Sequence, residues 1–156
     1  MSSTLREIAF EGVIEADLLT QGYVAIDHKD FDKELAIFPN VTLDFIRTSQ
    51  PKEWQKLEAL LGNNTRKQVL NDLCKWMDTY GSLATLRHGF KCYGRTVRVA
   101  FFKAAHGLNA EMKRQYAANQ VGITRQLHYS QKNNNSIDVT LSINGIPVIT
   151  LELKNP

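Results

Sequence analysis

The last part of the chain alternates apolar and polar residues with a period of two, which predicts paired β-strands. In residues 136–143 the apolar residues share one face, and Asp138 is the only charged residue. The stretch that follows Asn144–Gly145 ends in Glu152 and Lys154, which project to the same side of a strand, roughly 6 to 7 Å apart at two rises. Because Asn and Gly accept the backbone angles of a tight turn, Asn144–Gly145 predicts a hairpin.

The register of this hairpin determines whether its two carboxylates share a face. A two-residue loop at Asn144–Gly145 would pair Asp138 with Leu151 and place Asp138 and Glu152 on opposite faces. A three-residue loop would shift the register by one and bring Asp138 opposite Thr150 or Glu152. A site shared by both carboxylates therefore predicts a loop of odd length.

Apolar residues at helical spacings run from the N-terminus to about residue 21, where Gly22 ends the predicted helix. Thr4 and Glu7 fit a capping box at its start. Glu7, Glu11 and Glu15 form an i, i+4 line on one face. Such a line is typical of a solvated acidic stripe, which is our interpretation of Glu7 and Glu15.

The middle of the chain is predicted to be mostly helical. One helix runs from Pro51 to Leu61, and a second, capped by Asn64 or Thr65, extends to about Tyr80. Residues 89–102 alternate loosely, as strands do, and residues 110–119 resemble a short helix. With 156 residues, 43% of them hydrophobic, the chain is long enough for one core, and we expect a single α/β domain over residues 1–156.

Two carboxylates and an amine near one hairpin suggest metal-dependent phosphodiester chemistry. Magnesium prefers oxygen ligands, so Asp138 and Glu152 together with a substrate phosphate could form its site. An ammonium such as Lys154 could orient the attacking water or stabilise charge on the phosphoryl oxygens. The alternative is that Glu152 and Lys154 are solvated charges on the outer face of a half-buried hairpin.

The charge of the chain is unevenly distributed. Its net charge is only +3, but residues 87–132 carry nine basic residues against the single acid Glu111, which gives +8 there and −5 elsewhere. A basic block of this kind suits a phosphodiester backbone, and ordinary solvated charge is the equal alternative. The candidate DNA contacts are Arg87, Lys91, Arg125 and Lys132. Arg87, in the Leu86–Phe90 stretch, is either a specific contact or a buried structural arginine.

No segment predicts secretion or membrane insertion. The N-terminus lacks the regions of a signal peptide, and no apolar run approaches the length of a membrane span. Cys74 and Cys92 are isolated and have no zinc-like spacing, which fits free thiols in a reducing cytoplasm. We therefore expect a cytoplasmic protein.

Residues 136–156 resemble the endonuclease core of type I restriction enzyme R (motor) subunits, which belong to the PD-(D/E)xK nuclease superfamily. Four earlier stretches resemble the same family: Phe10–Glu11 with Gly22–Tyr23, Thr48–Trp54, Leu86–Phe90 and Tyr129–Ser130. The resemblance implies a restriction-endonuclease-like α/β core, with a mixed central sheet flanked by helices. It also implies Mg²⁺ ligation by Asp138 and Glu152, a catalytic Lys154 and an acidic contribution from Glu11.

Two departures from the family pattern limit this inference. The aspartate follows Ile137, whereas the superfamily name has a proline, and the chain ends at Pro156, before the following helix and the ATP-driven motor of R subunits. No Gly-x-x-x-x-Gly-Lys-Ser/Thr loop occurs in the sequence, so ATP would act only through regions absent from this chain. We expect the chain to be the N-terminal piece of a larger subunit, cut off at the C-terminal end of its nuclease domain.

Two functions follow from these features. The first is a Mg²⁺-dependent endonuclease domain that acts on double-stranded DNA with the methylation and specificity subunits of a type I restriction-modification complex. The second is a catalytically inactive nuclease-like module for DNA binding or subunit docking.

Overall fold

The computed structural model describes residues 3–107 and 109–154, without the side chains of Ser3 and Thr4, and groups the chain into two compact units. Unit 1 comprises Met1–Phe38 and Gln120–Pro156, and unit 2 comprises Pro39–Asn119. The expectation of one domain over the whole chain stays a prediction.

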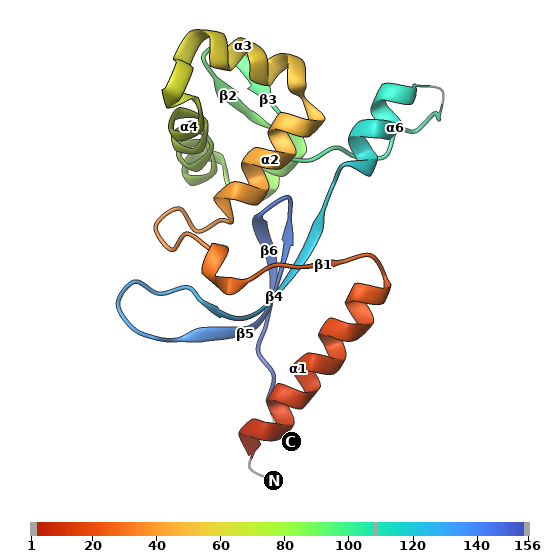
Figure 1. Ribbon diagram of the computed structural model, residues 1–156, viewed down its shortest axis with the longest axis vertical. Coiled ribbons are helices and arrows are strands. Elements are labelled where there is room, and N and C mark those ends of the chain that lie inside the picture. Colours follow the sequence, from red (N-terminus) through yellow and green to blue (C-terminus); the bar gives the residue numbers. More distant parts are fainter. Residues whose placement is uncertain (1–2, 108, 155–156) are drawn as a thin grey trace. The chain divides into compact units, whose positions relative to one another are not determined.

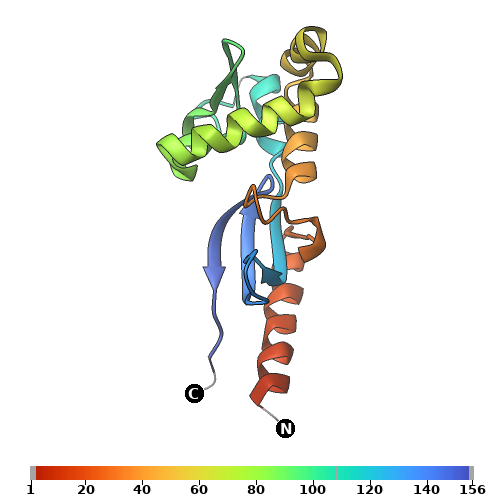
Figure 2. The ribbon, with the colours of Figure 1, turned by 90° about the vertical axis from the view of Figure 1, so that its left-hand side faces the viewer.

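Unit 1 contains a four-stranded mixed sheet with the order β1-β4-β5-β6. Its strands are β1 (Val24–Ala25), β4 (Val121–His128), β5 (Ser136–Ile143) and β6 (Ile146–Leu151), and only the β1–β4 pair is parallel. Helix α1 (Ser3–Thr20) runs beside this sheet next to β4 (Figures 1 and 2). Ile26, Phe38, Ile123, Leu127 and Val139 belong to the buried core of this unit.

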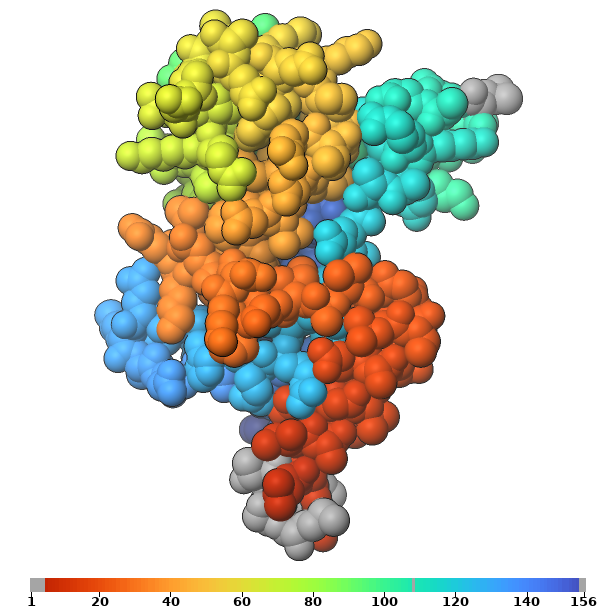
Figure 3. Space-filling model, viewed as in Figure 1, coloured from red at the N-terminus to blue at the C-terminus, as the bar shows by residue number. Residues whose placement is uncertain are grey.

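The connection between α1 and unit 2 covers part of the sheet. After β1 comes the short 3-10 helix η1 (His28–Asp30), capped by the Asp27 carboxylate, which accepts a hydrogen bond from the Lys29 amide at 2.9 Å. Asp27 is thus the N-cap of η1, a position at which aspartate is strongly preferred. Figure 3 shows one face of unit 1, on which α1 and the segment up to Phe38 lie over the strands.

Unit 2 is mainly helical. It contains α2 (Pro39–Ser49), α3 (Pro51–Leu61), η2 (Gly62–Asn64), α4 (Thr65–Tyr80), α5 (Ser82–His88) and α6 (Ala110–Ala117). Of these, α3, α4 and α6 correspond to the helices predicted for residues 51–61, for the stretch up to about Tyr80 and for residues 110–119. The hairpin of β2 (Phe90–Cys92) and β3 (Arg95–Val97) packs against α4, as Figure 2 shows. The α/β class with a mixed sheet and flanking helices is therefore confirmed. No helix in the described part of the chain is long and apolar enough to cross a membrane.

The β5–β6 hairpin corrects our prediction of an odd-length loop. Ile143 pairs with Ile146, so the loop has two residues, and the positive φ angles of Asn144 (50°) and Gly145 (85°) are those of a tight hairpin turn. The register nevertheless changes further along, because a β-bulge intervenes between the pairs formed by Ser142 and Leu141.

This bulge sets the register near the predicted site. Ser142 pairs with Pro147 and Leu141 with Ile149, so Val148 is the extra residue in β6. Beyond it, Val139 pairs with Leu151, which is the last pair of the ladder, and the same register continued by one step would bring Asp138 opposite Glu152. The shift that we assigned to the loop occurs within the strand.

Candidate active site

Glu11 is the only acidic residue of α1 whose side chain is fully buried in the described structure, with 1% of its surface exposed. Its Oε2 lies 3.3 Å from Nε of Arg125, and its Oε1 accepts a hydrogen bond from Nε2 of Gln126 at 2.7 Å. Glu15 is partly buried and lies 3.2 Å from Nη1 of Arg125. The i, i+4 line of acids is thus not a uniformly solvated stripe, and our interpretation of Glu15 was wrong.

Asp138 lies on β5, and its carboxylate has partners on both sides. Oδ1 accepts a hydrogen bond from Nε2 of Gln126 at 3.3 Å, and Oδ2 accepts one from the backbone amide of Leu153 at 2.6 Å. The second bond attaches the residues after β6 to β5. Gln126 therefore joins the carboxylates of Glu11 and Asp138, which are far apart in the sequence.

These side chains line one small pocket, which we call the carboxylate pocket. It has a volume of about 400 Å³ and is lined by Glu7, Ile8, Glu11, Arg125, Gln126 and Asp138. In residues 3–107 and 109–154, no group of three His, Cys, Asp or Glu side chains is arranged to hold a metal ion. The pocket thus brings Asp138 and Glu11 together, without a third ligand already in place.

Glu152 and Lys154 follow the end of β6, and both are exposed. Within the described residues no hydrogen bond or ion pair holds either side chain. Glu152 lies one residue beyond the last β5–β6 pair, Val139–Leu151, so the ladder itself does not pair it with Asp138, and Lys154 lies two residues further along. Their catalytic roles therefore stay predictions.

The candidate DNA contacts have different surroundings. The Arg125 guanidinium faces α1, where Nη2 also donates to the carbonyl of Ile8 at 3.2 Å. Desolvation lowers the pKa of Arg125, but its bonds to Glu15 and Glu11 outweigh this effect and raise the pKa overall. Lys132 is exposed in the loop between β4 and β5.

Arg87 and Lys91 belong to unit 2 and are exposed. Arg87 lies in the last turn of α5, which ends at His88 and is followed by Gly89 with a φ of 74°. Because the Arg87 side chain is exposed, the alternative of a buried structural arginine at this position is wrong. Lys91 donates from Nζ to Oγ1 of Thr96 at 2.6 Å. Contact of either residue with DNA stays a prediction.

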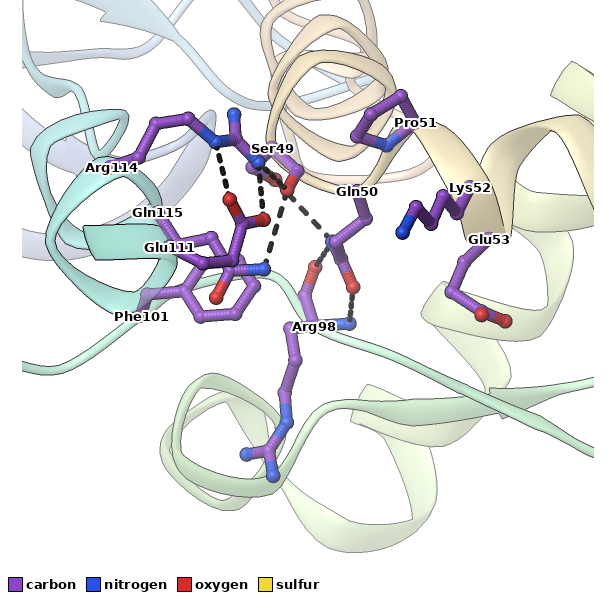
Figure 4. Close-up of a pocket in the computed structure, with 10 residues that line it drawn as sticks. All are labelled: Ser49, Gln50, Pro51, Lys52, Glu53, Arg98, Phe101, Glu111, Arg114 and Gln115. Carbon is purple, nitrogen blue, oxygen red and sulfur yellow. Dashed lines mark hydrogen bonds and ion pairs between the residues drawn. The ribbon is translucent and has the colours of Figure 1, made fainter. Parts of the chain in front are cut away.

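A larger cavity, of about 740 Å³, lies within unit 2 at the start of α3 (Figure 4). None of the predicted catalytic residues lines it. Several of its polar groups bind one another or the main chain, since Arg114 contacts Glu111 at 2.7 Å and the Ser49 carbonyl at 3.1 Å, and the Gln50 amide pairs with the main chain of Arg98. We therefore assign the candidate site to the carboxylate pocket.

The role of Gln126 was not anticipated from the sequence. Two signals could have identified it. Val121, Ile123 and Leu127 form a period-two pattern that predicts a strand, and Gln126 is a polar residue inside this strand. An uncharged amide is a common side chain, however, and only the fold brings it between Glu11 and Asp138.

The mixed sheet and the paired acidic residues define a fold compatible with the core of a nuclease. A family model described as Type I restriction enzyme R protein N terminus matches residues 11–156, and the chain belongs to this family. The match includes all four predicted catalytic residues, beginning with Glu11. Comparisons with curated proteins and with solved structures gave no match.

Proposed function

We propose that this chain is the metal-dependent endonuclease domain of a type I restriction-modification R subunit and that it hydrolyses phosphodiester bonds in double-stranded DNA. The observation that carries the proposal is the convergence of Glu11 and Asp138 on one pocket. The β5–β6 register, continued one step beyond its last pair, would bring Glu152 opposite Asp138. Membership of the R-subunit family supports the same reaction class.

The donor set fits Mg²⁺ in its chemistry. The available ligands are carboxylate oxygens, and Mg²⁺ in phosphate-transfer sites commonly uses one or two carboxylates, waters and substrate phosphate oxygens. Asp138 and Glu152 would hold the ion, and Glu11 would add negative charge beside it. The ion would supply an activated water and stabilise charge on the phosphoryl oxygens. The exposed Lys154 ammonium would attract and orient the phosphate.

The other activities of a restriction complex would come from elsewhere. ATP-driven translocation would require other parts of the R subunit, and target recognition would require the methylation and specificity subunits. Arg87, Lys91 and Lys132 are exposed and could contact the DNA backbone without reading its sequence. Arg125 is the weakest of the four candidates, because its guanidinium already binds α1.

One observation favours a second candidate function. Glu152 and Lys154 have no partners among the described residues, and no group of three metal ligands is arranged there. A nuclease-like module that binds DNA or docks another subunit, without cutting, fits this feature. The two functions differ in whether the carboxylates are required for cleavage.

The test uses a complete R subunit containing this chain, assembled with its partner subunits in Mg²⁺ and ATP. We expect Asp138→Ala, Glu152→Ala and Lys154→Ala to abolish DNA cleavage and leave ATP hydrolysis intact. Asp17→Ala is the control, since Asp17 is an exposed acid of α1 that bonds only locally, to Gln21 at 2.8 Å. Undiminished cleavage by all three variants would refute the site, and a wild-type assembly that binds DNA without cutting it would favour the docking module.

A further inference from the structure

We propose that Gln126 is a positioning residue that holds the Glu11 and Asp138 carboxylates in place for a divalent cation. This inference rests on the proposed function and adds a residue to its site. It is carried by the hydrogen bonds of the Gln126 amide and by the unusual backbone that presents this amide.

The side-chain amide of Gln126 makes three hydrogen bonds, two to carboxylates and one to a hydroxyl. Nε2 donates to Oε1 of Glu11 at 2.7 Å and to Oδ1 of Asp138 at 3.3 Å. Oε1 accepts a hydrogen bond from Oγ of Ser136 at 2.8 Å. Because ionised carboxylates only accept hydrogen bonds, they select the orientation in which the amide nitrogen faces them, and the Ser136 hydroxyl, which can donate, holds the amide oxygen in that orientation.

The backbone at Gln126 departs from regular strand geometry. Its φ is +49°, and it is the only described non-glycine residue with a positive φ inside a strand, since Ala36, Tyr93 and Asn144 lie in turns. This conformation is unfavourable for a residue with a Cβ atom. The β4–β5 ladder passes from the Arg125–Val139 pair to the Leu127–Ile137 pair without pairing Gln126 with Asp138.

This departure has a direct consequence for the site. Adjacent residues of a regular strand project to opposite faces, yet the side chains of both Arg125 and Gln126 contact Glu11. The left-handed backbone at Gln126 breaks the alternation and makes both contacts possible. Strained backbone of this kind is concentrated at functional sites, where the surrounding structure maintains it.

The chemistry of an amide suits this position. Of the two carboxylates, only Glu11 has an ion-pair partner in the described structure, Arg125, so N–H donors from the amide offset the remaining repulsion between them. Unlike lysine, a neutral amide does not compete with a cation by charge. Each carboxylate also keeps lone pairs that the amide does not use. Groups that orient metal ligands in this way typically change metal affinity by about 10- to 100-fold when they are removed.

The experiment measures Mn²⁺ binding to the 156-residue chain by electron paramagnetic resonance. Gln126→Gly removes the amide and still permits the positive φ, so we expect it to fold and to weaken Mn²⁺ binding by about 10- to 100-fold. Ala36→Gly is the matched control, because Ala36 has a φ of 57° in an exposed turn of the same unit and should bind Mn²⁺ as the wild type does. Circular dichroism checks that each variant is folded.

Two further variants separate the possible failures. Asp138→Ala should abolish Mn²⁺ binding, and Ser136→Ala, which frees the orientation of the amide, should weaken it less than Gln126→Gly does. Binding that depends on Asp138 but is unchanged in Gln126→Gly would overturn this inference and leave the proposed function in place. No Mn²⁺ binding by the wild type, or binding that Asp138→Ala does not affect, would overturn the proposed metal site and the inference with it.

Discussion

Replacing Arg125 by methionine should destabilise unit 1, because the guanidinium compensates the buried carboxylate of Glu11. Arg125 lies 3.3 Å from Glu11, which is 1% exposed, and 3.2 Å from Glu15. Removing one partner of a fully buried ion pair costs about 3 to 5 kcal/mol. Arg125 itself is 29% exposed, and Gln126 still donates to Glu11 in the variant. We therefore expect the free energy of unfolding to fall by about 2 to 3 kcal/mol at pH 7.

Urea denaturation followed by far-UV circular dichroism would measure this loss. Trp54 and Trp76 both lie in unit 2, so tryptophan fluorescence would not report directly on the change. Arg6→Met is the control, since Arg6 is exposed on the same helix, and it should change stability by less than about 0.5 kcal/mol. An equally small change in Arg125→Met, together with weaker DNA binding, would refute the structural role and restore Arg125 as a DNA contact.

Two further predictions concern buried groups. Asn144 is fully buried with a φ of 50°, and its Oδ1 accepts the Gln120 amide at 2.7 Å, so Asn144→Ala should cost about 2 to 4 kcal/mol in unfolding free energy. Asn144→Gly should cost less because glycine accepts this φ, and equal losses would exclude the contribution of strain. Desolvation and a hydrogen bond with Asp72 raise the pKa of the Cys92 thiol to about 12, so at pH 8 a thiol reagent should modify Cys92 only after unfolding. Rapid labelling of Cys92 in the folded protein would contradict this prediction. Because the pKa of the folded thiol is above that of the unfolded chain, the stability that the neutral thiol contributes should persist below about pH 9 and be lost as the pH rises towards 12.

Local signals in the sequence were sufficient for most helices and for the hairpin strand. Pro51 at the first position of α3 and Gly62 after its end correspond to the bounds Pro51–Leu61. The alternation of residues 136–143 matches β5 at both ends. These features could be predicted because each depends on side-chain spacing or on the backbone preference of one or two residues.

The register could not be predicted in the same way. The Asn144–Gly145 turn follows its local preference and forms a two-residue loop, and the shift occurs at Val148, which carries no turn signal. A valine is an ordinary strand residue, so its extrusion as a bulge is decided by the packing of the whole sheet. Likewise, nothing local to Gln126 favours a positive φ.

The two irregularities lie on the two strands that flank Asp138. The bulge at Val148 shifts the register of β6 so that Val139, next to Asp138, pairs with Leu151, and the left-handed backbone at Gln126 in β4 directs an amide to both Asp138 and Glu11. With regular geometry in β6, Leu151 would pair with Asp138 instead of Val139, and with regular geometry in β4, Arg125 and Gln126 could not both reach Glu11. Departures from local rules are expected where function requires them. That both surround one aspartate is an argument for the carboxylate pocket that is independent of any sequence motif.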